Sequence, residues 1–89
     1  MKAFVTVMGP DRIGIIAEVT TLLCSYSVNV LDISQTVMQG TFTMTMLVDT
    51  EKATLTFDGL RDALLLKGEQ MRLSIRIQRE DIFDAMHTI

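Results

Sequence analysis

Hydrophobic and polar positions along this chain follow two periods, one typical of strands and one typical of helices. Residues 42–48 alternate strictly, so Phe42 and Met44 lie on the opposite side of a predicted strand from Thr43 and Thr45. Apolar residues within 13–26 recur instead at helical spacing. The whole pattern predicts strands over 3–8, 30–38, 42–48 and 71–78, helices over 13–26 and 55–67, and a short closing helix over 81–86.

Turn-forming residues separate these elements. Gly9-Pro10-Asp11 ends the first strand, and Asp11 lies where the N-cap of the first helix is expected. Gln39-Gly40 predicts a two-residue hairpin turn, because Gly40 can take a positive φ. Gly68 predicts the end of the second helix.

The order strand, helix, strand, strand, helix, strand is the ferredoxin-like βαββαβ pattern of an α+β fold. Two right-handed crossovers would place both helices on one face of a four-stranded antiparallel sheet. The opposite face is expected to carry Phe4, Thr6 and Met8, and a tail helix or a second subunit is expected to cover it. We therefore expect a single domain over 1–89, with the core in 1–78 and the tail helix in 79–89.

Composition and charge exclude several classes of protein. With 48% hydrophobic and 21% charged residues, the chain is globular rather than disordered. The net charge of −3 and the lack of a Lys/Arg run argue against direct binding of nucleic acid. No signal peptide precedes the first strand and no apolar run is long enough to cross a membrane, so we expect no membrane contact and a cytoplasmic location.

Candidate catalytic and metal-binding groups are few. Cys24 and His87 are the single residues of their types and fit no recognisable nucleophile motif, so no enzyme activity is expected. Cys24 is expected to be a buried or half-buried structural thiol. Glu80, Asp84 and His87 have a spacing that could converge on a metal, but an exposed helix face is the favoured interpretation, so no metal or cofactor is predicted.

The loop Gly9–Gly14 has chemistry that suits a ligand site. A helix N-terminus presents free amides and favours a carboxylate. Asp11 could pair with an amino group and Arg12 with a carboxylate, while Gly14 lets a ligand approach the backbone. The alternative is a turn with an N-cap and a solvated charge, and the residues alone leave both interpretations open.

The stretch Gly9-Pro10-Asp11-Arg12-Ile13-Gly14-Ile15-Ile16-Ala17 resembles the opening of ACT domains, which carry an Asp/Asn-Arg-x-Gly signature in this loop. Val28–Ile33 is similar to the start of their second strand. Asp32–Thr36 and Glu80–His87 are similar to a bacterial family of stand-alone ACT-domain proteins, which is itself similar to the ACT halves of the glycine cleavage system transcriptional repressor. The resemblance covers essentially the whole chain.

This resemblance implies a regulatory module that binds an amino acid or a similar small ligand, possesses the βαββαβ fold, and acts in the control of amino-acid metabolism. It implies a homodimer or higher homo-oligomer with ligand between subunits, and the open edge of the second strand is expected to pair. The alternative is a ligand-free interaction module that docks a metabolic enzyme or regulator. The implied ligand-binding residues are Asp11, Arg12, Ile13 and Gly14 of one subunit and Asn29, Val30, Leu31 and Asp32 of its neighbour.

Overall fold

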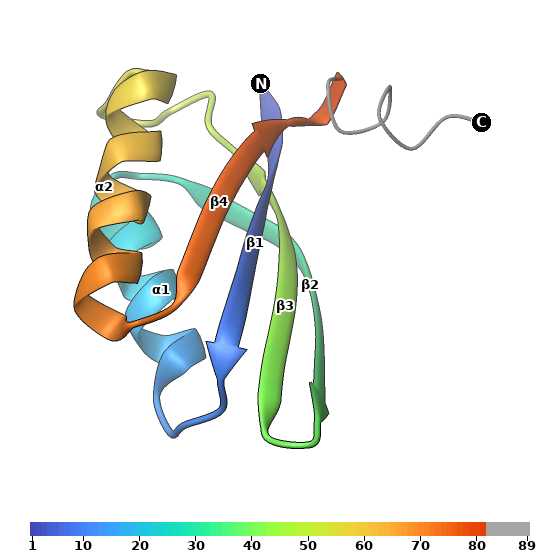
Figure 1. Ribbon diagram of the computed structural model, residues 1–89. Helices are drawn as coiled ribbons and strands as arrows, with labels where there is room; N and C mark the ends of the chain where they lie inside the picture. The colour runs from blue at the N-terminus through green and yellow to red at the C-terminus, as the bar shows by residue number, and fades with distance from the viewer. Residues whose placement is uncertain (82–89) are drawn as a thin grey trace.

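A computed structural model describes residues 1–81, which form four strands and two helices. Figure 1 shows the strands as one twisted sheet with both helices on the same side of it. The predicted order of elements is confirmed. The elements are β1 (Lys2–Pro10), α1 (Ile15–Ser25), β2 (Asn29–Met38), β3 (Thr41–Asp49), α2 (Phe57–Met71) and β4 (Ser74–Arg79).

The antiparallel sheet has the strand order β2-β3-β1-β4, so β1 and β3 are central and β2 and β4 are the edges. This is the ferredoxin-like arrangement that the sequence predicts. The last residue of β1, Pro10, pairs with Thr41, the first residue of β3. The loop between β1 and α1 therefore lies at the same end of the sheet as the turn between β2 and β3.

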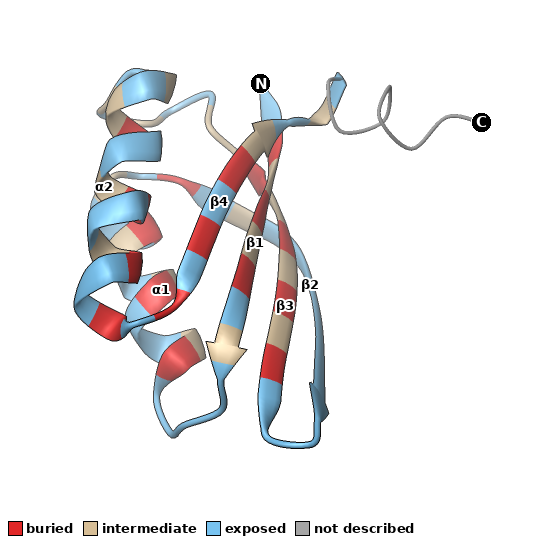
Figure 2. Cartoon of the chain, in the orientation of Figure 1, coloured by how far each residue is buried: buried red, intermediate tan, exposed pale blue. Residues whose placement is uncertain are grey.

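The hydrophobic core lies between the helices and the sheet face that they cover. Figure 2 shows buried and less buried residues alternating along β1, β3 and β4. The alternation predicted for 42–48 is confirmed, because Phe42, Met44, Met46 and Val48 are buried while Thr43, Thr45 and Leu47 between them stay partly exposed. The largest fully buried side chains are Ile15, Leu23, Met44, Met46, Leu60, Leu64, Ile75, Val5, Val7, Val19 and Val48.

The predicted end of α2 at Gly68 is wrong. The helix continues to Met71, and Arg72 caps it with a φ of 58°, so β4 begins at Ser74 rather than at Met71. Gly68 is buried inside the helix, where an added Cβ would lie 2.7 Å from the carbonyl oxygen of Leu73. Glycine is needed at this position because the chain leaving the helix passes directly over it.

The prediction of a buried or half-buried thiol is also wrong, because Cys24 is exposed. The buried residues of α1 are Ile15, Val19 and Leu23, which recur every four residues. Cys24 lies one position further around the helix than Leu23 and so faces away from the sheet. The spacing of the buried residues explains the exposure.

The sheet face opposite the helices carries Phe4, Thr6 and Met8, as predicted, and Met8 is 48% exposed. The tail helix predicted over 81–86 lies outside the described residues apart from Asp81.

Within residues 1–81, neither helix combines the length and the apolar composition needed to cross a lipid bilayer.

Candidate functional site

The first turn of α1 begins at a glycine rather than at an acidic cap. Gly14 is the N-cap, with a φ of 92°, and within residues 1–81 no side chain caps this end of the helix. The prediction of Asp11 as the N-cap is therefore wrong. The positive φ, which favours glycine, turns the chain into the helix at Ile15, too far along the chain for the Asp11 carboxylate to act as its cap.

The amides at the start of α1 are available to a ligand. The first intrahelical bond runs from the amide of Glu18 to the carbonyl oxygen of Gly14, at 2.9 Å. The amides of Ile15, Ile16 and Ala17 precede that bond, and such amides have no partner inside a helix. Together with the helix dipole they favour a negatively charged group at this end.

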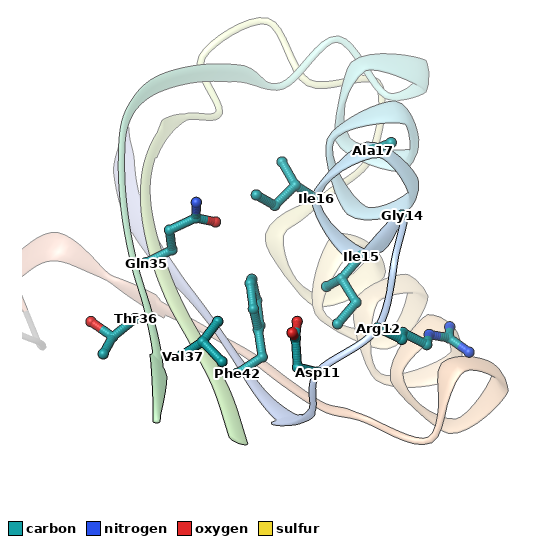
Figure 3. A pocket seen from close by; sticks show the side chains of 10 residues that line it. All are labelled: Asp11, Arg12, Gly14, Ile15, Ile16, Ala17, Gln35, Thr36, Val37 and Phe42. Carbon is teal, nitrogen blue, oxygen red and sulfur yellow. The ribbon is translucent and has the colours of Figure 1, made fainter. Parts of the chain in front are cut away.

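An open hollow of about 630 Å³ lies between the start of α1 and the end of β2. The β1–α1 loop and the first turn of α1 form one wall, and β2 with the start of β3 forms the other (Figure 3). The hollow is large enough for an amino acid and for a partner side chain beside it. The lining residues are Asp11, Arg12, Gly14, Ile15, Ile16, Ala17, Gln35, Thr36, Val37 and Phe42.

The side chains in this hollow differ in direction. Figure 3 shows the Asp11 carboxylate and the Phe42 ring pointing into the space between the two walls. The amide of Gln35 reaches from β2 toward Ile16 on α1. Arg12 points away from β2. The hollow therefore combines a carboxylate, an amide, apolar surface and the free backbone amides of α1.

Arg12 is engaged on the outer side of α1. Its guanidinium lies 3.4 Å from a carboxylate oxygen of Glu18, and Lys67 of α2 lies 3.7 Å from the other oxygen. Glu18 thus sits between two cations, and all three side chains remain partly exposed. Because Glu18 neutralises part of the Arg12 charge, the helix amides are the principal positive feature facing the hollow.

The structure brings only part of the implied site together. Asp11, Arg12 and Gly14 line the hollow, whereas Ile13 is fully exposed and does not. The second implied group, Asn29–Asp32, lies at the opposite end of β2 from the hollow of its own chain. A β-bulge between Val30 and Asp32 interrupts the pairing there.

Sequence reasoning missed the contribution of Gln35, Val37 and Phe42. The signal was present, because the predicted turn at Gln39-Gly40 and the antiparallel pairing of β1 with β3 bring these residues to the end of the sheet where α1 begins. The predicted hairpin turn and the predicted strand pairing together place these residues at the same end of the sheet as Asp11.

Metal ligands do not gather in the described part of the chain, since residues 1–81 contain no group of three or more His, Cys, Asp or Glu side chains suited to a metal ion. Of the spaced residues Glu80, Asp84 and His87, only Glu80 lies within the described residues.

Comparison with known proteins gives a consistent match. A family model described as ACT domain matches residues 3–78. A UPF0237 protein of Listeria innocua is 45% identical over 89 residues, which is the full length of both chains. An ACT domain protein from Streptococcus pneumoniae of known structure has a TM-score of 0.82 and 37% identity over 93% of each chain.

The same fold occurs inside longer proteins. A formyltetrahydrofolate deformylase from Pseudomonas syringae matches with a TM-score of 0.79 and 27% identity, over 88% of this chain and 27% of that one. A protein described as a glycine cleavage system transcriptional repressor matches with a TM-score of 0.74 and 26% identity, over 86% of this chain and 44% of that one. The fold thus accompanies both enzymes and regulators.

Proposed function

The chain belongs to the ACT domain family, and from this membership and the geometry of the hollow we propose that it is a regulatory, non-catalytic module that binds an amino acid. In this proposal it acts as a homodimer or higher homo-oligomer in the cytoplasm, where the exposed Cys24 stays reduced. The ligand lies in the hollow beside α1.

The observation that carries the proposal is that the hollow presents groups suited to both charges of an amino acid. The uncapped amides of Ile15 and Ile16 suit the carboxylate of an amino acid. The Asp11 carboxylate, which points into the hollow from the loop before α1, suits its ammonium group. Val37 and Phe42 then offer apolar surface to the side chain of the ligand. A ligand with one charge alone would satisfy only half of this arrangement.

The edge of β2 supports the proposed assembly. β2 is exposed along nearly its whole length, and Val37 and Met38 are 53% and 69% exposed. Two β2 strands paired antiparallel about their centres would lay Asn29–Asp32 of a second copy beside Gln35–Met38 of the first. The second implied group of ligand residues would then approach the hollow from the neighbouring subunit, as in the site inferred from the family resemblance.

The test is a thermal-shift screen of the full chain against the twenty amino acids, followed by equilibrium dialysis of any that raise Tm. A ligand at one hundred times its Kd should stabilise the chain by about 2.7 kcal/mol. Asp11→Asn should weaken binding of the same ligand about tenfold or more, because a charge-assisted hydrogen bond is lost. Asp62→Asn, a matched change on the exposed side of α2, should leave binding unchanged.

No stabilisation by any amino acid at millimolar concentration would refute the proposed ligand class. Binding that survives Asp11→Asn at full strength would refute the site.

A second candidate function, docking of a metabolic enzyme or regulator without ligand, is favoured by the exposed apolar residues of β2. This second function predicts that Val37→Asp disrupts association with the partner protein and that no amino acid raises Tm in the thermal-shift screen.

A further inference from the structure

The second edge strand of the sheet, β4, borders a groove next to α2. Two neighbouring hollows of about 330 and 510 Å³ share the lining residues Arg61, Ile77 and Gln78, and together they are called the α2–β4 groove below. Leu65 of the first hollow is 45% exposed, and Phe57 of the second is half-buried. Figure 1 shows β4 at the side of the sheet that α2 flanks. Folded proteins usually cover a partly apolar groove beside an open strand edge.

This groove is basic, although the chain as a whole carries a net charge of −3. Arg61, Arg76 and Arg79 line it. Arg61 lies 3.4 Å from Asp58, and Arg79 lies 3.6 Å from Asp81. Within residues 1–81, the exposed Arg76 has no ion-pair partner. An acidic and partly apolar segment would complement this surface.

The chain leaves the described residues beside this groove. β4 ends at Arg79, which lines the second hollow, and Asp81 lies 3.6 Å from the Arg79 guanidinium. Residues 82–89 combine the acidic Asp84 with the apolar Ile82, Phe83, Met86 and Ile89. Fully extended, this segment spans at most about 28 Å, so it can run along the groove in either a compact or an extended form.

We propose that residues 82–89 occupy the α2–β4 groove of their own chain, with their apolar side chains in the two hollows and Asp84 paired with Arg76. The segment then covers the edge of β4 and leaves β2 as the edge through which copies pair. A chain with one open edge forms a closed dimer, whereas a chain with two open edges can continue to add copies. The segment therefore limits the size of the assembly.

Amide hydrogen exchange of the full chain tests the docking. The amides of 83–89 should exchange about tenfold or more slower than in a peptide of the same sequence, the scale of a locally stable structure. Arg76→Glu should remove this protection, and adding Asp84→Arg should restore it. Arg72→Glu is the matched control, because Arg72 is also exposed, has no ion pair within residues 1–81 and does not line the groove.

Exchange of 83–89 at the rate of the free peptide would overturn the proposal, as would an equal effect of Arg72→Glu and Arg76→Glu. Protection that rises with protein concentration would place the segment on a second copy and overturn docking in its own chain. A chain ending at Asp81 should form assemblies larger than the full chain in light scattering over a range of concentrations. An unchanged mass for that shortened chain, folded by circular dichroism, would refute the limiting role.

Discussion

The backbone amide of Asp11 donates a hydrogen bond of 2.9 Å to the carbonyl oxygen of Gly40, which ties the loop before α1 to the turn between β2 and β3. This bond joins the two walls of the candidate site. Gln39 and Gly40 have φ values of 52° and 77°, the two positive values of a tight hairpin turn. The turn thereby helps fix the position of Asp11, the residue that the proposed function assigns to the ammonium group.

Gly40→Ala should destabilise the chain by about 1 kcal/mol, because a residue with a Cβ is strained at a positive φ. An added Cβ would meet nothing within 4 Å, so the cost comes from the backbone alone. Denaturant unfolding measures it. Gln39→Gly in the same turn should change stability by less than about 0.5 kcal/mol. Glycine removes the strain of a positive φ in the folded chain, but it also makes the unfolded chain more flexible, and the two effects oppose each other. An unchanged stability of Gly40→Ala would contradict this account of the turn.

Gly68→Ala should destabilise the chain by about 1–3 kcal/mol, as expected for overpacking. The usual gain of about 1 kcal/mol from replacing glycine in a helix is reversed, because the new Cβ would lie 2.7 Å from the Leu73 carbonyl oxygen. Gly59→Ala in the same helix is the comparison, and its nearest contact is a side-chain oxygen of Thr56 at 3.2 Å. Thermal unfolding should show the larger loss for Gly68→Ala. The reverse order would show that the chain after α2 moves aside easily.

Thr56→Ala should lower stability by about 1 kcal/mol through loss of the N-cap of α2. The Thr56 hydroxyl accepts a hydrogen bond of 3.1 Å from the amide of Gly59. Thr56→Ser retains the hydroxyl and should stay close to the original stability in the same denaturant titration. If Thr56→Ser and Thr56→Ala lower the stability equally, then the hydroxyl contributes nothing and the methyl group accounts for the effect.

Asp49→Asn should reduce stability at neutral pH and have less effect in acid. The Glu51 amide donates a hydrogen bond to the Asp49 carboxylate, and this bond and the nearby N-terminal ammonium group hold its pKa below the ordinary 3.8. A lowered pKa in the folded chain means that the carboxylate stabilises the fold above pH 3.8 and loses this contribution as the pH falls through the folded value.

Denaturant unfolding between pH 7 and pH 2 should therefore show the original and Asp49→Asn curves converging below pH 3.8. Asp62→Asn, at an exposed position on α2, serves as the control for the general effect of removing a negative charge. A constant difference between the original chain and Asp49→Asn across this range would show that ionisation of Asp49 is not the cause.

The sequence by itself determined the fold, because the relevant information is local. Alternation along β3, helical spacing from Ile15 to Leu23 and the Gln39-Gly40 turn each depend on residues close in the chain. Their order then leaves few arrangements in which every apolar face is buried. Part of the candidate site, Asp11, Arg12 and Gly14, followed from the same local loop.

Only the tertiary structure decided how distant segments meet. Gln35, Val37 and Phe42 complete the hollow because strand pairing brings the end of β2 and the start of β3 to the end of the sheet where α1 begins, which no local period encodes. Gly68 is explained by the backbone that crosses it rather than by the end of a helix. Periodicity indicates which face of a helix or strand is buried. The close approach of two backbone segments and the shape of a pocket depend instead on residues far apart in the chain. These features are therefore fixed only when the helices and strands pack together.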